Sequence, residues 1–140
     1  MKKITSITLA VLLLTICKIF GQGIETPVDK IPALLCNKWE IDYVLMGGMK
    51  ISRTPGAADI VYEFNKNKTF ATSGKGDSKI AKGTWVYDEK KKEINLVSGG
   101  KSNMKVISLK QNELIMLADT KEATPDVPMQ LKMVFKIKPD

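Results

Sequence analysis

The sequence has no histidine, and only two of its 140 residues are cysteine. Histidine is the commonest general base in enzymes and the commonest transition-metal ligand, while structural zinc sites need clusters of cysteine and histidine. No glycine-rich phosphate loop opens a helix, because the sequence has no long helical pattern. Catalysis by two carboxylates stays open, but the predicted strands bring no such pair to an inner face. We therefore expect no enzyme activity, no cofactor and no metal site.

A hydrophobic run long enough to cross a membrane is also missing. The longest apolar run, residues 7–16, is about half the roughly 20 residues that a membrane span needs. It follows Lys2 and Lys3 and precedes the small residue Gly21, the arrangement of a secretory signal peptide. We predict that residues 1–21 are cleaved before Gln22, which leaves a secreted or periplasmic protein without a transmembrane segment. An uncleaved N-terminal anchor is the alternative.

The two cysteines predict neither a disulfide nor a lipid anchor. Cys17 lies in a sequence that resembles a lipoprotein cleavage box, but the bulky Ile16 stands where that box needs a small residue. We therefore expect no lipoprotein anchoring at Cys17, which leaves with the signal peptide. Cys36 then has no partner within the mature chain. Its neighbours Leu34 and Leu35 predict a small buried hydrophobic residue rather than a reactive thiol.

The charge of the mature chain is mildly basic. Loss of Lys2, Lys3 and Lys18, three positive charges, lowers the formal charge from +7 to +4. The remaining charges alternate along the predicted strands instead of forming one patch, which is typical of the solvated outer faces of a sheet. We expect no nucleic-acid partner.

Alternation of apolar and polar residues is the strongest pattern in the chain. Side chains alternate between the two faces of a strand, so a period of two predicts a half-buried β-strand. In residues 37–45 one face is predicted to carry Trp39, Ile41, Tyr43 and Leu45. In residues 129–138 one face carries Met129, Leu131, Met133, Phe135 and Ile137. Strands of this kind at opposite ends of one domain suggest a sheet that closes on itself.

Short turn-rich connections separate eight such segments. The predicted strands are residues 37–45, 60–64, 69–73, 79–87, 93–97, 103–109, 113–118 and 129–138. This spacing predicts an all-β domain over residues 37–140, an antiparallel up-and-down meander of about eight strands that forms a closed barrel, a sandwich or a curved open sheet. Residues 22–36 are predicted to be a leader with a short helical turn that plugs one end. Residues 46–59 are predicted to be a long loop without a strand.

The connections differ between the two ends of the predicted meander. Those after the first, third, fifth and seventh strands contain every glycine of the connections and the two longest loops. Those after the second, fourth and sixth strands are short and rich in lysine. Alternate connections of a meander lie at the same end, so one end is predicted to be long-looped and the other tightly turned. Barrels with a ligand mouth at one end show this asymmetry.

Several short motifs together resemble a known family. They are Asn37-Lys38-Trp39, then Tyr62-Glu63-Phe64 with Thr69-Phe70, then Gly83-Thr84-Trp85-Val86-Tyr87. The chain resembles the lipocalin-like domains of small secreted bacterial proteins over roughly residues 31–138. The resemblance implies a barrel or half-open barrel of about eight antiparallel strands with an apolar interior and no catalytic machinery. In it Trp39 matches the tryptophan of a Gly-x-Trp motif, Asn37 stands where the glycine would be, and residues 46–59 match a long first loop.

Aromatic and methionine side chains at strand spacing are the candidate ligand-binding residues. They are Trp39, Tyr43, Tyr62, Phe64, Phe70, Trp85, Met104, Met116, Met133 and Phe135. They line an apolar pocket if the barrel is hollow, and they are plain core if it is filled. The first reading makes the protein a non-enzymatic carrier of a small apolar ligand or lipid at the long-loop end. The second makes it a protein-interaction or inhibitor module with an envelope protein partner.

Overall fold

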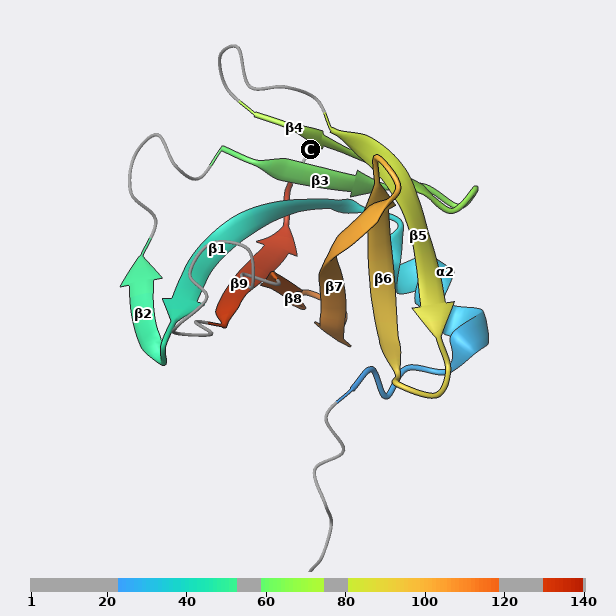
Figure 1. The fold of residues 1–140 in the computed structure, drawn as a ribbon, viewed down its shortest axis with the longest axis horizontal. Helices are drawn as coiled ribbons and strands as arrows, with labels where there is room; N and C mark the ends of the chain where they lie inside the picture. The colour runs from blue at the N-terminus through green and yellow to red at the C-terminus, as the bar shows by residue number, and fades with distance from the viewer. Residues whose placement is uncertain (1–22, 53–58, 75–80, 119–129, 140) are drawn as a thin grey trace, which may run out of the picture.

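The computed structural model describes residues 23–52, 59–74, 81–118 and 130–139. Two short helical segments, η1 (Val28–Lys30) and α2 (Ile31–Leu35), precede nine strands (Figure 1). The strands are β1 (Lys38–Met46), β2 (Met49–Ser52), β3 (Val61–Phe64), β4 (Thr69–Ser73), β5 (Lys82–Asp88), β6 (Glu93–Ser98), β7 (Lys101–Leu109), β8 (Leu114–Ala118) and β9 (Leu131–Ile137). The predicted signal peptide, residues 1–21, and the predicted strand start at Met129 lie outside the described residues.

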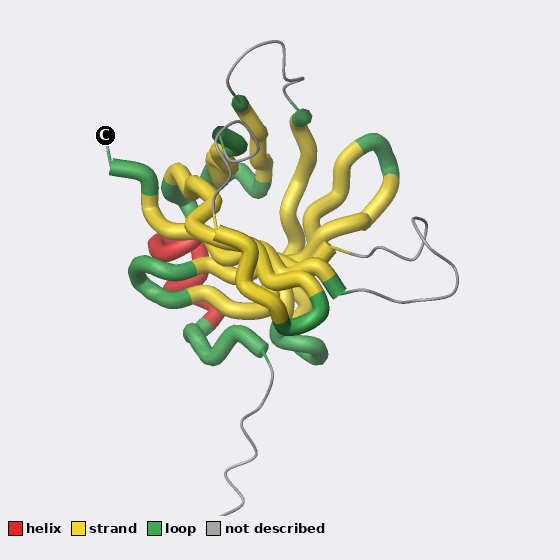
Figure 2. Tube along the Cα trace, turned by 90° about the vertical axis from the view of Figure 1, so that its left-hand side faces the viewer, coloured by secondary structure: helices red, strands yellow, loops and turns green. Residues whose placement is uncertain are grey.

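Eight of the strands close into one antiparallel barrel. From β3 to β9 each strand pairs with the next along the chain, and β1 pairs with both β3 and β9. The strands therefore wind around a single interior, as Figure 2 shows. The predicted all-β barrel is confirmed, and continuous pairing excludes both the sandwich and the open sheet. Each predicted strand corresponds to an observed one, with ends that shift by a few residues.

One strand was not predicted. Residues 46–59 were expected to be a loop throughout, but Met49–Ser52 forms β2, which pairs antiparallel with the second half of β1. Gly47 and Gly48 have φ of 56° and 83°. Two left-handed residues are what a tight two-residue hairpin requires, so these glycines allow β1 to turn straight into β2. The hairpin extends the barrel wall as a lip, and four residues are too few for a periodic pattern to reveal.

The face assignment in β1 was correct only in its first half. Trp39 and Ile41 are in the core, but the register with β9 shifts between Ile41 and Tyr43, which leaves Asp42 as a β-bulge. A bulge residue reverses the alternation that follows it. Tyr43 therefore pairs with Val134 on the outer face, while Val44 pairs with Met133 and packs on the core. The predictions that Tyr43 and Leu45 face inward are wrong.

The helical segment closes one end of the barrel, as the sequence predicts. Ile31 and Leu35 of α2 are buried in the core, and the Trp39 Nε1–H donates to the Leu35 carbonyl oxygen at 3.0 Å. The Trp85 Nε1–H donates to the Asn65 carbonyl oxygen at 3.1 Å, in the turn between β3 and β4. Both indole rings are fully buried, and each N–H has the acceptor that a buried donor needs. We call this end the base.

The strand order confirms the predicted separation of the connections. The turns that join β3 to β4, β5 to β6 and β7 to β8 lie at the base with α2. The opposite end, which we call the mouth, carries the β1–β2 hairpin, the β6–β7 turn and the ends of the other strands. A Cβ atom on Gly83 would collide with the Val97 carbonyl oxygen and lie 2.7 Å from the Phe70 ring. Gly83 therefore marks a close backbone approach.

Candidate binding site in the barrel interior

Nine of the ten predicted site residues lie in the core or pack against it. Six are buried at the base and around the middle, namely Trp39, Phe64, Phe70, Trp85, Met116 and Phe135. Tyr62, Met104 and Met133 are only partly buried and pack against that core. Tyr43 is the exception, because the bulge at Asp42 turns it outward. Burial therefore divides the predicted site residues into a packed core and a group of side chains that stay partly accessible.

Tyr62 crosses the interior and forms a floor. Its hydroxyl donates to the Sδ atom of Met104 at 3.3 Å, from β3 to β7, and three strands separate β3 from β7 in either direction around the barrel. The Tyr62 ring stacks on Phe64 and Phe70 and meets Phe135 edge-on, with centroids 5.4 to 6.2 Å apart. These contacts occupy the middle of the barrel. A ligand site in the barrel interior would therefore lie between this floor and the mouth.

Burial also affects the chemistry of the Tyr62 hydroxyl. Desolvation raises the pKa of Tyr62 above its ordinary value, because removal from water disfavours the phenolate. A thioether sulfur is a weak acceptor, so the Tyr62 hydroxyl is a weakly satisfied donor. A ligand with one polar atom could take that hydrogen bond while its apolar part lies nearer to the mouth.

Apolar side chains line the inner face above this floor. Val44 pairs with Met133 and Met46 pairs with Leu131 across β1 and β9, so these four side chains share the inner face. The same face continues onto β2, where Ile51 pairs with Val44 and Met49 pairs with Met46. Exposure increases outward, from buried residues at the floor to 42% for Ile51 and 70% for Met49. The interior thus continues as an exposed apolar lip.

Sequence reasoning missed several members of this set. The period of two leaves Val44 on the outer face of β1, because such a period does not reveal a bulge, and Met46 was assigned to the loop of residues 46–59. Leu131 was placed on the inner face but not among the site residues, and Met49 and Ile51 lie in residues 46–59, which were expected to be a loop. The signal that was available is the clustering of methionine in the segments that flank the mouth.

A family model for a lipocalin-like domain matches residues 37–116. The chain belongs to the lipocalin-like domain family. The match runs from β1 to the middle of β8, and β9, which closes the barrel onto β1, follows it. No curated protein and no solved structure gives a significant match. Lipocalin-like domains are in general binding folds rather than enzymes.

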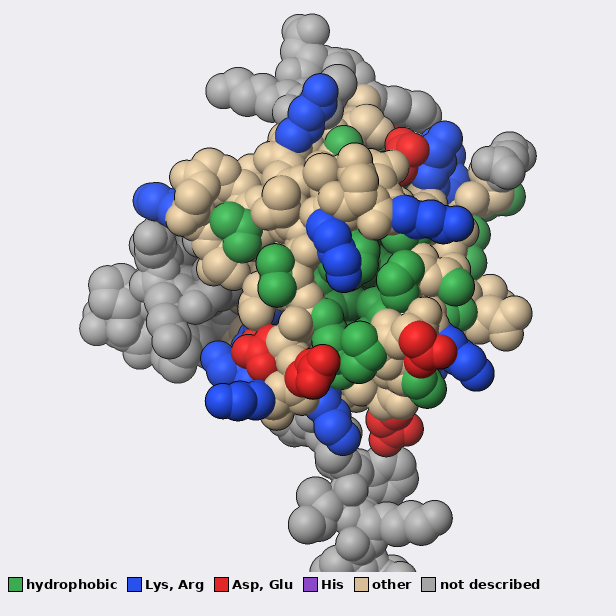
Figure 3. Space-filling view, turned by 90° about the vertical axis from the view of Figure 1, so that its right-hand side faces the viewer, with side chains coloured by type: hydrophobic (Ala, Val, Ile, Leu, Met, Phe, Trp, Pro, Cys, Tyr) green, Lys and Arg blue, Asp and Glu red, His purple; other side chains and the backbone are tan. Residues whose placement is uncertain are grey.

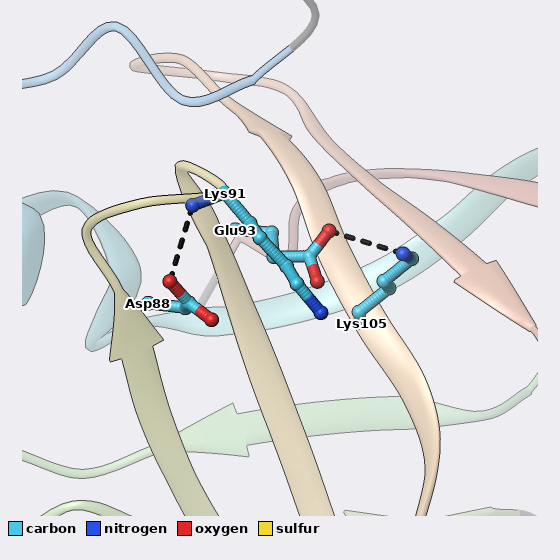
Figure 4. Close-up of polar contacts among 4 residues, drawn as sticks. All are labelled: Asp88, Lys91, Glu93 and Lys105. Carbon is cyan, nitrogen blue, oxygen red and sulfur yellow. Dashed lines mark hydrogen bonds and ion pairs between the residues drawn. The ribbon is translucent and has the colours of Figure 1, made fainter.

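Several acidic side chains of this lipocalin-like domain have structural roles. Asp88 accepts hydrogen bonds from the backbone N–H groups of Lys90 and Lys91 at 3.0 and 3.1 Å, which fixes the β5–β6 turn. Glu93 forms an ion pair with Lys105 at 3.0 Å on the outer face (Figure 4). Within the described ranges no polar or charged side chain is buried, and no three metal-ligating side chains cluster. The described interior therefore offers an apolar surface and one phenol.

Cys36 lies outside this interior, at the base of the lipocalin-like barrel. It is half-buried and packs against the core, and it lines a shallow surface groove of about 380 Å³ between β1, β3 and the end of β9. Burial raises the pKa of the Cys36 thiol, although Lys66 and Lys68 act against that shift. A thiol with a raised pKa is largely protonated at neutral pH, which agrees with the predicted packing role.

No helix among the described residues is long and apolar enough to cross a membrane.

Proposed function

We propose that this lipocalin-like protein is a secreted, non-enzymatic binding protein that takes a small apolar molecule or a lipid chain at the mouth of its barrel. The observation that supports this best is the gradient of exposure along the inner face. Below the Tyr62–Met104 contact the side chains are buried, whereas above it Val44, Met46 and Met133 are only partly buried. An apolar surface that stays partly open to water inside a concave wall is the usual form of a ligand site.

Methionine suits this site to ligands of varied shape. Met46, Met104 and Met133 lie around the space above the floor, and Met49 extends the set onto the lip. The methionine side chain is unbranched and polarizable, so it fills irregular gaps and adapts to different partners. We infer that the site selects for apolar character and size more than for a particular arrangement of polar groups.

Native mass spectrometry of residues 22–140, purified from the source envelope without detergent, tests this function first. A co-purifying small molecule that is lost on denaturation identifies the ligand class. Binding of an apolar fluorescent probe then locates the site through two matched variants. Met133→Gln puts a polar amide on the inner face of β9, whereas Leu117→Gln makes a similar change on the outer face of β8, where Leu117 pairs with Lys132.

We expect Met133→Gln to weaken probe affinity by roughly 5- to 100-fold, since an unpaired amide costs about 1–3 kcal/mol. Leu117→Gln should leave the affinity within about twofold of the unaltered protein. Equal effects of the two variants, or a probe that binds neither variant nor the unaltered protein, would contradict a site above the floor.

A second candidate function follows from the filled base. Trp85, Met116 and Phe135 are 0% exposed, so the part of the interior that they share is packed core. If the space above the floor also takes no ligand, the exposed lip with Met49 and Ile51 becomes the natural contact surface for an envelope protein. A bare mass in the native spectrum would favour this interaction module.

A further inference from the structure

We propose that the mouth of the barrel docks on a bilayer surface that contains anionic lipid. The docking surface, which we call the rim, consists of three exposed apolar residues, Met49, Ile51 and Ile60, and three lysines, Lys50, Lys82 and Lys101. The purpose of this docking rests on the proposed function, because docking would allow an apolar ligand to pass between the bilayer and the barrel interior. The docking itself depends only on the rim.

The exposed apolar side chains of the described structure are concentrated at the mouth. The large hydrophobic residues left exposed are Val28, Met49, Ile51, Ile60 and Val86. Met49 and Ile51 lie on β2, and Ile60 immediately precedes β3, at the end of the barrel away from α2. A monomeric protein seldom leaves such side chains grouped in water without a use for them. Grouped around an opening, they can enter the interfacial region of a bilayer together.

Lys50 helps to hold the lip in an orientation that turns its apolar face toward the opening of the barrel. Its Nζ atom lies over the Tyr43 ring, 4.1 Å from the centroid. Lys50 pairs with Leu45 on the outer face, so this contact keeps β2 against β1. Successive residues of a strand point to opposite faces, which leaves Met49 and Ile51 on the side of the barrel interior. The apolar face of the lip therefore borders the opening.

The charge of the rim complements an anionic surface. Ser98 connects Lys82 to Lys101, because it pairs with Lys101 across the β6–β7 turn and its hydroxyl donates to the Lys82 carbonyl oxygen at 2.8 Å. Among the described residues neither lysine has an ion-pair partner, in contrast to Lys105, which pairs with Glu93. Asp59 is an acidic residue near the rim and already has an interaction partner. Anionic headgroups would supply the missing countercharges.

Another apolar surface of the molecule lacks the combination of exposed apolar side chains with lysines alone. Figure 3 shows the side with β5 and α2, where apolar side chains gather among both lysine and acidic side chains. Val86 on β5 is 56% exposed there, but the nearby turn carries Asp88 and Glu93 in addition to its lysines. Mixed charge gives no net attraction to an anionic bilayer. This side therefore provides matched control positions.

Vesicle sedimentation of the full mature chain tests the proposal. The vesicles contain phosphatidylcholine with about one quarter phosphatidylglycerol, and pure phosphatidylcholine vesicles are the comparison. We expect the protein to bind the anionic vesicles at least tenfold more tightly, and high salt to abolish most of that difference because it screens the lysines. Protein that stays in the supernatant with both kinds of vesicle overturns the proposal.

Two pairs of variants locate the surface. The first double variant combines Met49→Glu with Ile51→Glu, and the second combines Lys82→Glu with Lys101→Glu. We expect each to weaken vesicle binding at least tenfold. For the second, the reason is that each lysine near such a surface contributes about fivefold to binding. Val86→Glu, and Lys90→Glu with Lys91→Glu at the base, are the matched controls and should bind within about twofold of the unaltered protein. Thermal unfolding of every variant shows that it is folded. Equal losses in rim and control variants overturn the assignment to the rim.

Binding of the apolar probe in vesicle-free solution separates this inference from the proposed function. Lys82→Glu with Lys101→Glu should leave probe affinity unchanged while vesicle binding falls. If the protein binds the probe but not the vesicles, only the docking proposal is overturned. The rim is then a candidate contact surface for a protein partner. Vesicle binding without probe binding overturns the ligand site and leaves a peripheral membrane protein.

Discussion

At the scale of single residues, the base of the barrel depends on large side chains whose polar atoms are all paired. Trp39 is fully buried, and its indole N–H donates to Leu35 in the helical turn. It therefore connects β1 to the segment that closes the base. The loss of such a side chain removes both packing and the contact that holds α2 in place.

We expect Trp39→Ala to lower the free energy of unfolding by about 3–5 kcal/mol, as large core truncations do. Trp39→Phe keeps most of the ring and loses mainly the N–H, so its cost should be clearly smaller. Urea denaturation followed by far-UV circular dichroism measures both. A near-neutral Trp39→Ala would show that Trp39 does not hold the base.

Tyr62 predicts a loss of stability at alkaline pH. Burial raises its pKa above 10.0 in the folded protein, so the folded state keeps the proton that the unfolded state releases. Stability is therefore fully present below about pH 10 and falls as the pH rises from there toward the folded pKa. Denaturation midpoints between pH 8 and pH 11 (about the range in which tyrosine titrates) measure this loss, and Tyr62→Phe should reduce it. An unchanged slope in Tyr62→Phe would show that Tyr62 does not cause the loss.

At the scale of secondary-structure elements, the bulge in β1 decides which side chains enter the site. Asp42 is the extra residue, and its carboxylate lies 3.9 Å from the Lys136 Nζ atom on the outer surface. If Asp42 were instead paired regularly with β9, the inward positions after Ile41 would be Tyr43 and Leu45 in place of Val44 and Met46. The composition of the mouth therefore depends on one inserted position.

Deletion of Asp42 tests this directly. Ile41, which faces inward, then precedes Tyr43, which faces outward, so we expect β1 to become regular and to keep its faces and its register with β9. Probe affinity should stay within about twofold of the unaltered protein, and the free energy of unfolding within about 1 kcal/mol, since only an exposed ion pair is lost. Deletion of Glu40, a regularly paired residue of β1, is the matched control, because it reverses the alternation next to the core and should cost about 3 kcal/mol or more. A deletion of Asp42 that is as damaging as the deletion of Glu40 would contradict the bulge assignment.

At the scale of the whole molecule, closure depends on the last strand. β9 pairs with β8 on one side and with β1 on the other, and it contributes the buried Val134 and Phe135. The family match ends at Met116, before this strand begins. The contacts nevertheless make β9 part of the folding unit.

Truncation after Gln130 should therefore abolish cooperative unfolding, since it exposes one edge of both β1 and β8 and removes two buried side chains. Truncation after Ile137 keeps the whole strand and should change stability by less than about 1 kcal/mol. Thermal unfolding followed by near-UV circular dichroism distinguishes the two. A cooperative transition in the shorter chain would show that β9 is dispensable.

The sequence by itself determined the fold class and most of the core, because alternation survives along stretches of most strands, including the first half of β1. Phe135 and Met133 in β9 were assigned correctly, as was the helical turn with Leu35 that plugs the base. Side-chain alternation is a local property, and a regular strand shows it whatever its neighbours are. Secretion and the signal peptide stay predictions, since residues 1–21 lie outside the described structure.

Only the tertiary structure decided how deep the candidate site is and which residues reach it. The Asp42 bulge exists because β1 must stay in register with β9, which lies about 90 residues further along the chain. The floor forms because closure brings Tyr62 opposite Met104, again from a distant strand. Both depend on pairing between segments far apart in the sequence, and no local pattern records such a pairing. The same closure separates the filled base from the open, apolar mouth.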